Sequence, residues 1–100
     1  MELNHEDGRF YLEDNGKTIG ELTYSKVEDN IISLDYTYVD EAYRGQGLAG
    51  KLFNAVVDFS DLKGLKIVPV CEYAKAAFEN RPEIRFLLTE NYQKLLKGEK

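Results

Sequence analysis

The spacing of apolar residues changes abruptly near residue 40, and this change limits the folds open to the chain. Residues 31–39 alternate between two faces, which predicts a β-strand. One face would carry Ile32, Leu34, Tyr36 and Tyr38, with both tyrosines packed on the sheet. From Gln46 to Asp61, apolar residues recur every three or four positions, which predicts an amphipathic helix. Residues 65–70 form a short apolar run typical of a buried strand. This order predicts a β-α-β crossover with two parallel strands.

The first 40 residues predict an antiparallel meander. Residues 10–14 and 17–27 have the alternation of strands, and Asn15-Gly16 between them favours a tight hairpin turn, because both residues tolerate positive φ. The segment before them, Met1 to Arg9, is polar. Its histidine, His5, is therefore expected to be a mobile surface residue.

The region after residue 70 predicts further helices. Residues 72–79 would form one, Pro82 would break or restart the chain, and residues 83–96 would form another. Residues 98–100 should fray. Together these elements predict one α/β (α+β) domain over residues 1–100, with a mixed, mostly antiparallel sheet and helices packed on it.

Composition excludes several classes of protein. The chain has a net charge of -5, with 13 Lys and Arg scattered among 18 Asp and Glu, so nucleic acid is not an expected partner. It has one cysteine, which allows no intrachain disulfide, and no His or Cys cluster that suggests a metal. No apolar run approaches the roughly 20 residues that span a bilayer, and the N-terminus lacks the apolar core of a signal peptide. We therefore expect a cytoplasmic protein without membrane association.

The segment from Arg44 to Gly50 carries the clearest chemical signal. A helix start has unpaired N–H groups and the positive end of the helix dipole, both of which favour an anion. Small side chains leave this backbone accessible; they are Gly45, Gly47, Ala49 and Gly50. Arg44 adds a cation, so the segment predicts a pyrophosphate site. It lacks the spacing and the hydroxyl of a nucleotide-triphosphate P-loop, and the early first strand of a dinucleotide-binding fold is missing.

Arg44, Gly47 and Ala49 match the signature of the GCN5-related N-acetyltransferases, which is Arg or Gln, two residues, Gly, one residue, then Gly or Ala. The resemblance covers roughly residues 31–80 and is strongest over residues 38–52. The chain also resembles small stand-alone members of about this length. That likeness rests on Ile67-Val68-Pro69-Val70-Cys71 and on Arg81-Pro82-Glu83.

The resemblance implies a minimal fold of this family that binds acetyl-CoA. Backbone groups of Tyr38 and Val39 would pair with the pantetheine arm, and N–H groups of residues 45–50 would hold the pyrophosphate. Cys71 and Ala74 would lie along the cofactor arm. The implied cofactor-binding residues are thus Tyr38, Val39, Arg44, Gly45, Gln46, Gly47, Leu48, Ala49, Gly50, Cys71 and Ala74.

The implied reaction is direct attack of a neutral amine, small or peptidic, on the acetyl thioester. Candidates for the base are Asp35, Glu41 and Glu72. Many family members protonate the departing thiolate with a tyrosine whose position here is Phe78, and Tyr73 is nearby in sequence. The alternatives are a non-catalytic module that binds CoA or acyl-CoA, and a structural domain with a vestigial loop. The sequence leaves the oligomeric state open.

Cys71 has three interpretations. It is a small buried hydrophobe, an unreactive residue at the thiol end of the cofactor, or a nucleophile that accepts the acetyl group. The last makes it the one candidate for a covalent catalytic residue.

Overall fold

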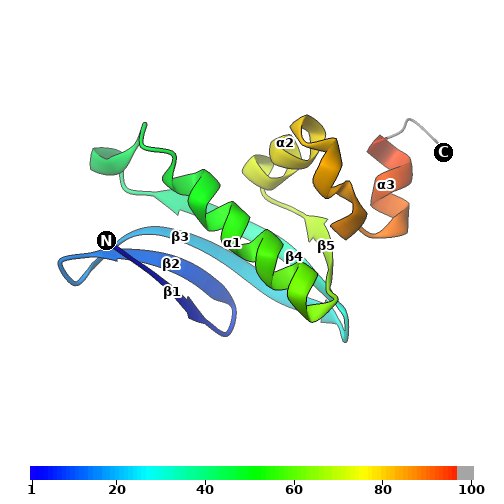
Figure 1. Cartoon of the computed structure of the whole chain (residues 1–100), viewed down its shortest axis with the longest axis horizontal. Coiled ribbons are helices and arrows are strands. Elements are labelled where there is room, and N and C mark those ends of the chain that lie inside the picture. Colours follow the sequence, from blue (N-terminus) through cyan, green and yellow to red (C-terminus); the bar gives the residue numbers. More distant parts are fainter. Residues whose placement is uncertain (97–100) are drawn as a thin grey trace.

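A five-stranded mixed sheet in the order β1-β2-β3-β4-β5 forms the frame of the molecule, in a computed structural model that describes residues 1–96 (Figure 1). Strands β2, β3 and β4 form the predicted antiparallel meander, β1 adds a further antiparallel strand at its edge, and β5 pairs with β4 in parallel. The strands are β1 (Glu2–Glu6), β2 (Arg9–Asp14), β3 (Lys17–Glu28), β4 (Ile31–Val39) and β5 (Lys66–Pro69). The predicted hairpin turn is confirmed, with φ of 50° at Asn15 and 78° at Gly16.

Helix α1 (Leu48–Lys63) crosses one face of the sheet and completes the predicted crossover (Figure 1). Its predicted span was correct to within two residues at each end. Leu52, Phe53 and Val56 of the helix are buried in the core, where Phe53 packs on Phe78 of the later helix α2 (Glu72–Asn80). At its C-terminal end, Gly64 adopts φ 69°, the left-handed conformation that ends many helices.

The C-terminal part consists of α2 (Glu72–Asn80), a 3₁₀ helix η2 (Pro82–Leu87) and α3 (Glu90–Leu96). The prediction of one helix over residues 83–96 was wrong. Leu88 is extended, fully buried and bridged in parallel to Ile67 of β5, so burial of this side chain interrupts the helix. Residues 98–100, predicted to fray, lie outside the described residues. None of the helices in the described part of the chain has the length and apolar character needed to cross a bilayer.

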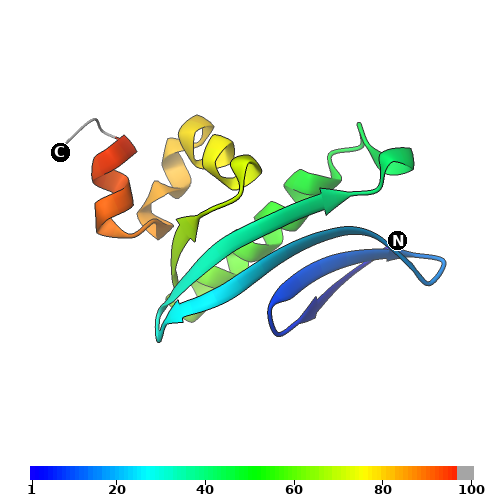
Figure 2. The ribbon, with the colours of Figure 1, turned by 180° about the vertical axis from the view of Figure 1, so that it is seen from behind.

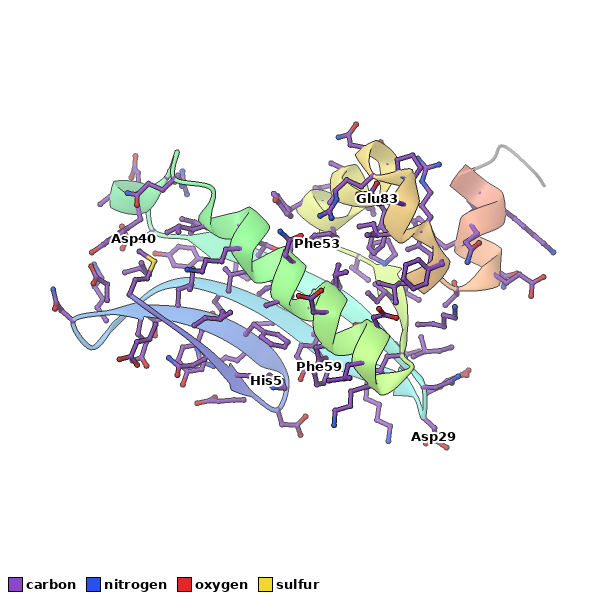
Figure 3. All side chains as sticks on the ribbon, viewed as in Figure 1. His5, Asp29, Asp40, Phe53, Phe59 and Glu83 are labelled. Carbon is purple, nitrogen blue, oxygen red and sulfur yellow. The ribbon has the colours of Figure 1, made fainter. Side chains whose placement is uncertain are left out.

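The N-terminal segment forms strand β1, which the sequence analysis missed. Its register pairs His5 with Phe10, and this places the histidine on the α1 side of the sheet. The His5 ring stacks on Phe10 with centroids 4.1 Å apart, and its Nε2 lies 2.6 Å from the Tyr24 hydroxyl. The ring of Phe59, from α1, meets it edge-on at 4.8 Å (Figure 3). His5 is therefore an ordered strand residue and not the mobile one that we expected.

A β-bulge in β4 changes which side chains share a face. Thr23 pairs with Tyr36 and Tyr24 pairs with Leu34, so Asp35 has no partner on β3. An extra residue reverses the alternation beyond it. Tyr36 and Tyr38 therefore point away from α1, with 57% and 36% of their surface exposed. The prediction that they share a packed face with Leu34 was wrong.

Candidate functional site

The parallel strands β4 and β5 separate just before the glycine-rich segment. Their pairing ends at Leu34 and Pro69, although β4 continues to Val39. The N–H groups of Val70 and Cys71 both donate to the Leu34 carbonyl, at 2.9 and 3.0 Å, as β5 turns away. Residues 35–39 thus have no strand partner on this edge within residues 1–96, which leaves backbone groups for a ligand.

A cavity of about 340 Å³ lies at the N-terminal end of α1, next to the end of β4. Its walls bring together most of the predicted cofactor residues and add two tyrosines. They are Val39, Tyr43, Arg44, Gly45, Gly47, Leu48, Ala49, Gly50 and Tyr73. Gln46 is exposed in the same loop but does not line the cavity.

The start of α1 presents free N–H groups to this cavity. Gly47 adopts φ 74° and ψ 20°, and no side-chain hydrogen bond caps the helix there. The first main-chain bond of the helix runs from Lys51 N–H to the Gly47 carbonyl at 3.1 Å, so the three preceding N–H groups lack a helical partner. A Cβ on Gly45 or Gly47 would meet nothing within 4 Å. Glycine is therefore needed here for positive φ, and it keeps the cavity open.

The loop before α1 is fixed to the β2-β3 hairpin. Asp40 caps the 3₁₀ helix η1 (Glu41–Tyr43) by accepting the Ala42 N–H at 2.9 Å. It also forms an ion pair with Lys17 at 3.1 Å. The Ala42 N–H, and then Lys17, lower the pKa of the Asp40 carboxyl. These contacts hold the loop in place before any ligand arrives.

Two further side chains order the same loop. The Tyr43 hydroxyl donates to Asp14 at 2.8 Å, and this bond is the largest cause of the raised pKa of Tyr43. Arg44 folds back, and its Nε donates to the Val39 carbonyl at 3.2 Å. The sequence analysis missed the contributions of Asp14, Lys17 and Tyr43, because their contacts cross about 20 to 30 positions of the chain.

Other predicted residues lie apart from the cavity walls. Cys71 is half-buried at the start of α2, and its Sγ lies 3.4 Å from the Thr37 hydroxyl. Ala74 is fully buried in the core, where its methyl group offers no surface to a ligand. Tyr38 lies in β4 beyond the end of its pairing with β5 and pairs with Glu21 of β3. The roles of these residues in cofactor binding stay predictions.

The three candidate bases lie in different places. Asp35 accepts hydrogen bonds from the hydroxyls of Ser25 and Ser33. Glu41 is exposed in the 3₁₀ helix before the cavity, and Glu72 is exposed in the first turn of α2, 3.4 Å from Lys75. The structure does not bring them together.

Two aromatic residues of α2 lie in different surroundings, one in the core and one at the cavity. Phe78 is fully buried, with its ring edge-on to Phe53 at 5.4 Å. Tyr73 instead lines the cavity, and its hydroxyl lies 3.5 Å from the point where a Cβ of Gly50 would be. Its ring also meets Phe53, which Figure 3 labels on α1, at 6.0 Å. The sequence analysis did not assign Tyr73 to the cavity, because spacing along α2 does not show which turn faces α1.

The crossover, the separated parallel strands and the glycine-lined helix start define a GCN5-like α+β domain. The family model described as GCN5-related N-acetyl-transferase matches residues 9–87. The chain belongs to the GCN5-related N-acetyltransferase family.

Solved structures show the same fold. A GCN5-like protein from Staphylococcus aureus, determined in solution by NMR, is 31% identical over 88% of this chain and 87% of its own, with a TM-score of 0.73. The Escherichia coli family member YhbS, solved in complex with CoA, is 29% identical over 69% of this chain and 42% of its own, with a TM-score of 0.59.

Protein NATD1 is a similar protein in animals. The chicken (Gallus gallus) and mouse (Mus musculus) forms are 35% identical to this chain over 66 residues. The match covers 66% of this chain and 60% of each relative, so the chain spans about three fifths of their length.

Proposed function

We propose that this chain binds coenzyme A and accepts acetyl-CoA as its acyl donor. The observation that carries the proposal is the uncapped start of α1, whose residues line a cavity that reaches Val39 at the end of the open edge of β4. Two linked phosphates suit the first feature, and an extended amide-bearing arm suits the second. The complex of YhbS with CoA supports this assignment of ligand.

The proposed reaction is acetyl transfer to an amine by direct attack. Acetyl-CoA supplies an activated acetyl group, and the N–H groups at the start of α1 hold its pyrophosphate. The backbone at Val39 or its neighbour would polarise the thioester carbonyl, and the gap beside β4 would orient the arm. The amine loses its proton to a base among Asp35, Glu41 and Glu72, or to water.

Two observations favour a second function, namely that of a CoA-binding module without catalysis. Phe78 is buried and carries no proton for a departing thiolate, and none of the three carboxylates lines the cavity. Tyr43 and Tyr73 both line the cavity, and because the Tyr43 hydroxyl donates to Asp14, the Tyr73 hydroxyl is the candidate proton donor. Replacing this hydroxyl by hydrogen, in Tyr73→Phe, therefore tests whether Tyr73 donates a proton.

Titration calorimetry with CoA and acetyl-CoA, followed by a thiol-release assay with a panel of amines and lysine peptides, tests both functions. The enzyme hypothesis expects saturable binding and thiol release that depends on the acceptor. Binding without acceptor-dependent release supports the module. Absence of binding, and no rise in melting temperature with ligand, refutes both.

A further inference from the structure

Within residues 1–96, one face of the sheet carries no helix. The helix α1 covers the opposite side, and the view from behind shows β4 in front of it (Figure 2). Because of the bulge at Asp35, Tyr36 and Tyr38 lie on this open face. Tyr11 shares it, since its neighbours in the strand, Phe10 and Leu12, are buried toward α1.

The tyrosines of this face surround a carboxylate. Glu21 pairs with Tyr11 on one side and with Tyr38 on the other, so the three side chains form one row across β2, β3 and β4. Alternation and register place four more carboxylates on the same face, which are Glu2, Glu6, Glu13 and Asp35. We call the whole set, with Tyr36, the tyrosine–carboxylate face.

Arg9 shows how this face accommodates a cation. Its Nε lies 3.0 Å from Glu6, its Nη1 lies 3.1 Å from Glu21, and its guanidinium carbon stands 3.8 Å above the Tyr11 ring centroid. Carboxylate on one side and aromatic ring on the other is a favourable environment for a guanidinium or ammonium group. Arg9 lies at the Tyr11 end of the row, and the side chains of Tyr36 and Tyr38 stay exposed to solvent.

The charge of the face selects the kind of partner. The face carries five carboxylates and the guanidinium of Arg9. Lys66 lies on β5, at the other edge of the sheet, where its Nζ donates to the Phe86 carbonyl. An anionic lipid surface or nucleic acid would be repelled. A chain with alternating cationic side chains matches the charge of this face, and its same-side spacing of about 6.5–7 Å is that of alternate residues along each of these strands.

We propose that the tyrosine–carboxylate face docks an extended, lysine- and arginine-rich segment of a partner polypeptide. This surface lies on the side of the sheet away from α1, whereas the CoA cavity lies at the start of α1. The inference therefore goes beyond the proposed function and does not depend on it.

Fluorescence anisotropy with a labelled alternating Lys-Gly peptide tests this surface, with a Ser-Gly peptide of equal length as control. Glu21→Gln and Tyr36→Ala should each weaken binding about three- to fivefold. Glu79→Gln, which makes the same charge change on exposed α2, should leave it unchanged. Arg9→Gln should strengthen binding, because it frees Glu6 and Glu21. Equal effects of Glu21→Gln and Glu79→Gln would overturn the proposal, as would equal affinity for the two peptides.

Two further measurements separate the possible outcomes. A Gly47→Val variant that no longer binds CoA should still bind the Lys-Gly peptide, so failure of the proposed function leaves this result intact. Circular dichroism confirms that each variant is folded. If sedimentation shows a dimer that Glu21→Gln dissociates, the occupant of the face is a second copy of this chain and the proposal is wrong.

Discussion

The Tyr43 hydroxyl donates to Asp14 at 2.8 Å and so joins the β2-β3 hairpin to the loop that precedes α1. Two more links lie beside it, namely the ion pair of Lys17 with Asp40 at 3.1 Å and the Asp40 N–H bond to the Ile19 carbonyl at 2.7 Å. The cavity at the helix start is therefore positioned by hairpin residues that belong to no glycine motif.

Tyr43→Phe removes one of these links and keeps the ring. Because the loop would then be less restrained before binding, we expect CoA affinity to fall about twofold to tenfold, the range for loss of one hydrogen bond. Titration calorimetry measures the change. Tyr92→Phe, in α3 and away from the cavity, is the matched control and should bind CoA normally. Equal affinities for both variants would show that the loop keeps its shape without the hydrogen bond from Tyr43 to Asp14.

Asp40 should make stability depend on pH in a defined direction. The Ala42 N–H and Lys17 lower its pKa from 3.8, so the carboxylate stabilises the fold above that pH, and this contribution is lost as pH falls through the folded-state pKa. Asp40→Asn keeps an acceptor for Ala42 but loses the charge. The difference in melting temperature between wild type and Asp40→Asn should be constant near neutral pH and shrink below about pH 4. An NMR titration in which Asp40 has its midpoint above 3.8 would contradict this.

Local spacing was sufficient to predict the β-α-β order and the accessible glycines at the start of α1. The alternation over residues 31–39 identified the strand, but the faces of Tyr36 and Tyr38 depend on the bulge at Asp35. That bulge is a property of pairing with β3, and no pattern within β4 reveals it.

The same reason explains the other errors. Strand β1 is short and polar, so its existence depends on β2 as a partner. Leu88 leaves its helix because Ile67 offers a buried bridge, and Tyr73 reaches the cavity because α2 packs on α1. Each of these contacts joins segments far apart in sequence, where propensity carries no information.

Restoring the family's tyrosine should fail in this core. Phe78 is fully buried and edge-on to Phe53, so Phe78→Tyr would place a hydroxyl in an apolar core, which costs about 1–3 kcal/mol when the group gains no hydrogen bond. We expect lower stability in urea unfolding and no gain in thiol release. Faster acceptor-dependent release with unchanged stability would show that the new hydroxyl reaches the cofactor.

Tyr73→Phe tests the candidate proton donor in the cavity, the Tyr73 hydroxyl, since the other tyrosine there, Tyr43, donates to Asp14. If Tyr73 donates a proton to the thiolate, kcat should fall at least tenfold, on the order of general-acid contributions, while CoA affinity changes little. Gly50 lies close to this hydroxyl, and Tyr73→Phe keeps the ring contact with Phe53, so the fold should be preserved. Steady-state kinetics with a thiol reagent provide kcat. An unchanged kcat would exclude proton donation by Tyr73.

Direct attack makes Cys71 dispensable for chemistry. Its Sγ contacts the Thr37 hydroxyl at 3.4 Å beside the gap between β4 and β5, so Cys71→Ala should alter packing slightly and retain acceptor-dependent turnover. Mass spectrometry of the protein mixed with acetyl-CoA alone should show no acetylated form. An acetyl group found on Cys71, together with lost turnover in Cys71→Ala, would establish the covalent route instead.

Gly47 and Gly64 form a matched pair at the two ends of α1. Both are left-handed, with φ of 74° and 69°, and a Cβ on either would meet nothing within 4 Å. Valine at either position should therefore cost a similar amount of stability, about 1–2 kcal/mol, for backbone strain. Only Gly47 lines the cavity, so Gly47→Val should lose CoA binding while Gly64→Val retains it. Thermal melts and calorimetry on both variants measure the two effects separately. If Gly47→Val binds CoA as tightly as Gly64→Val, the pyrophosphate does not lie on the start of α1.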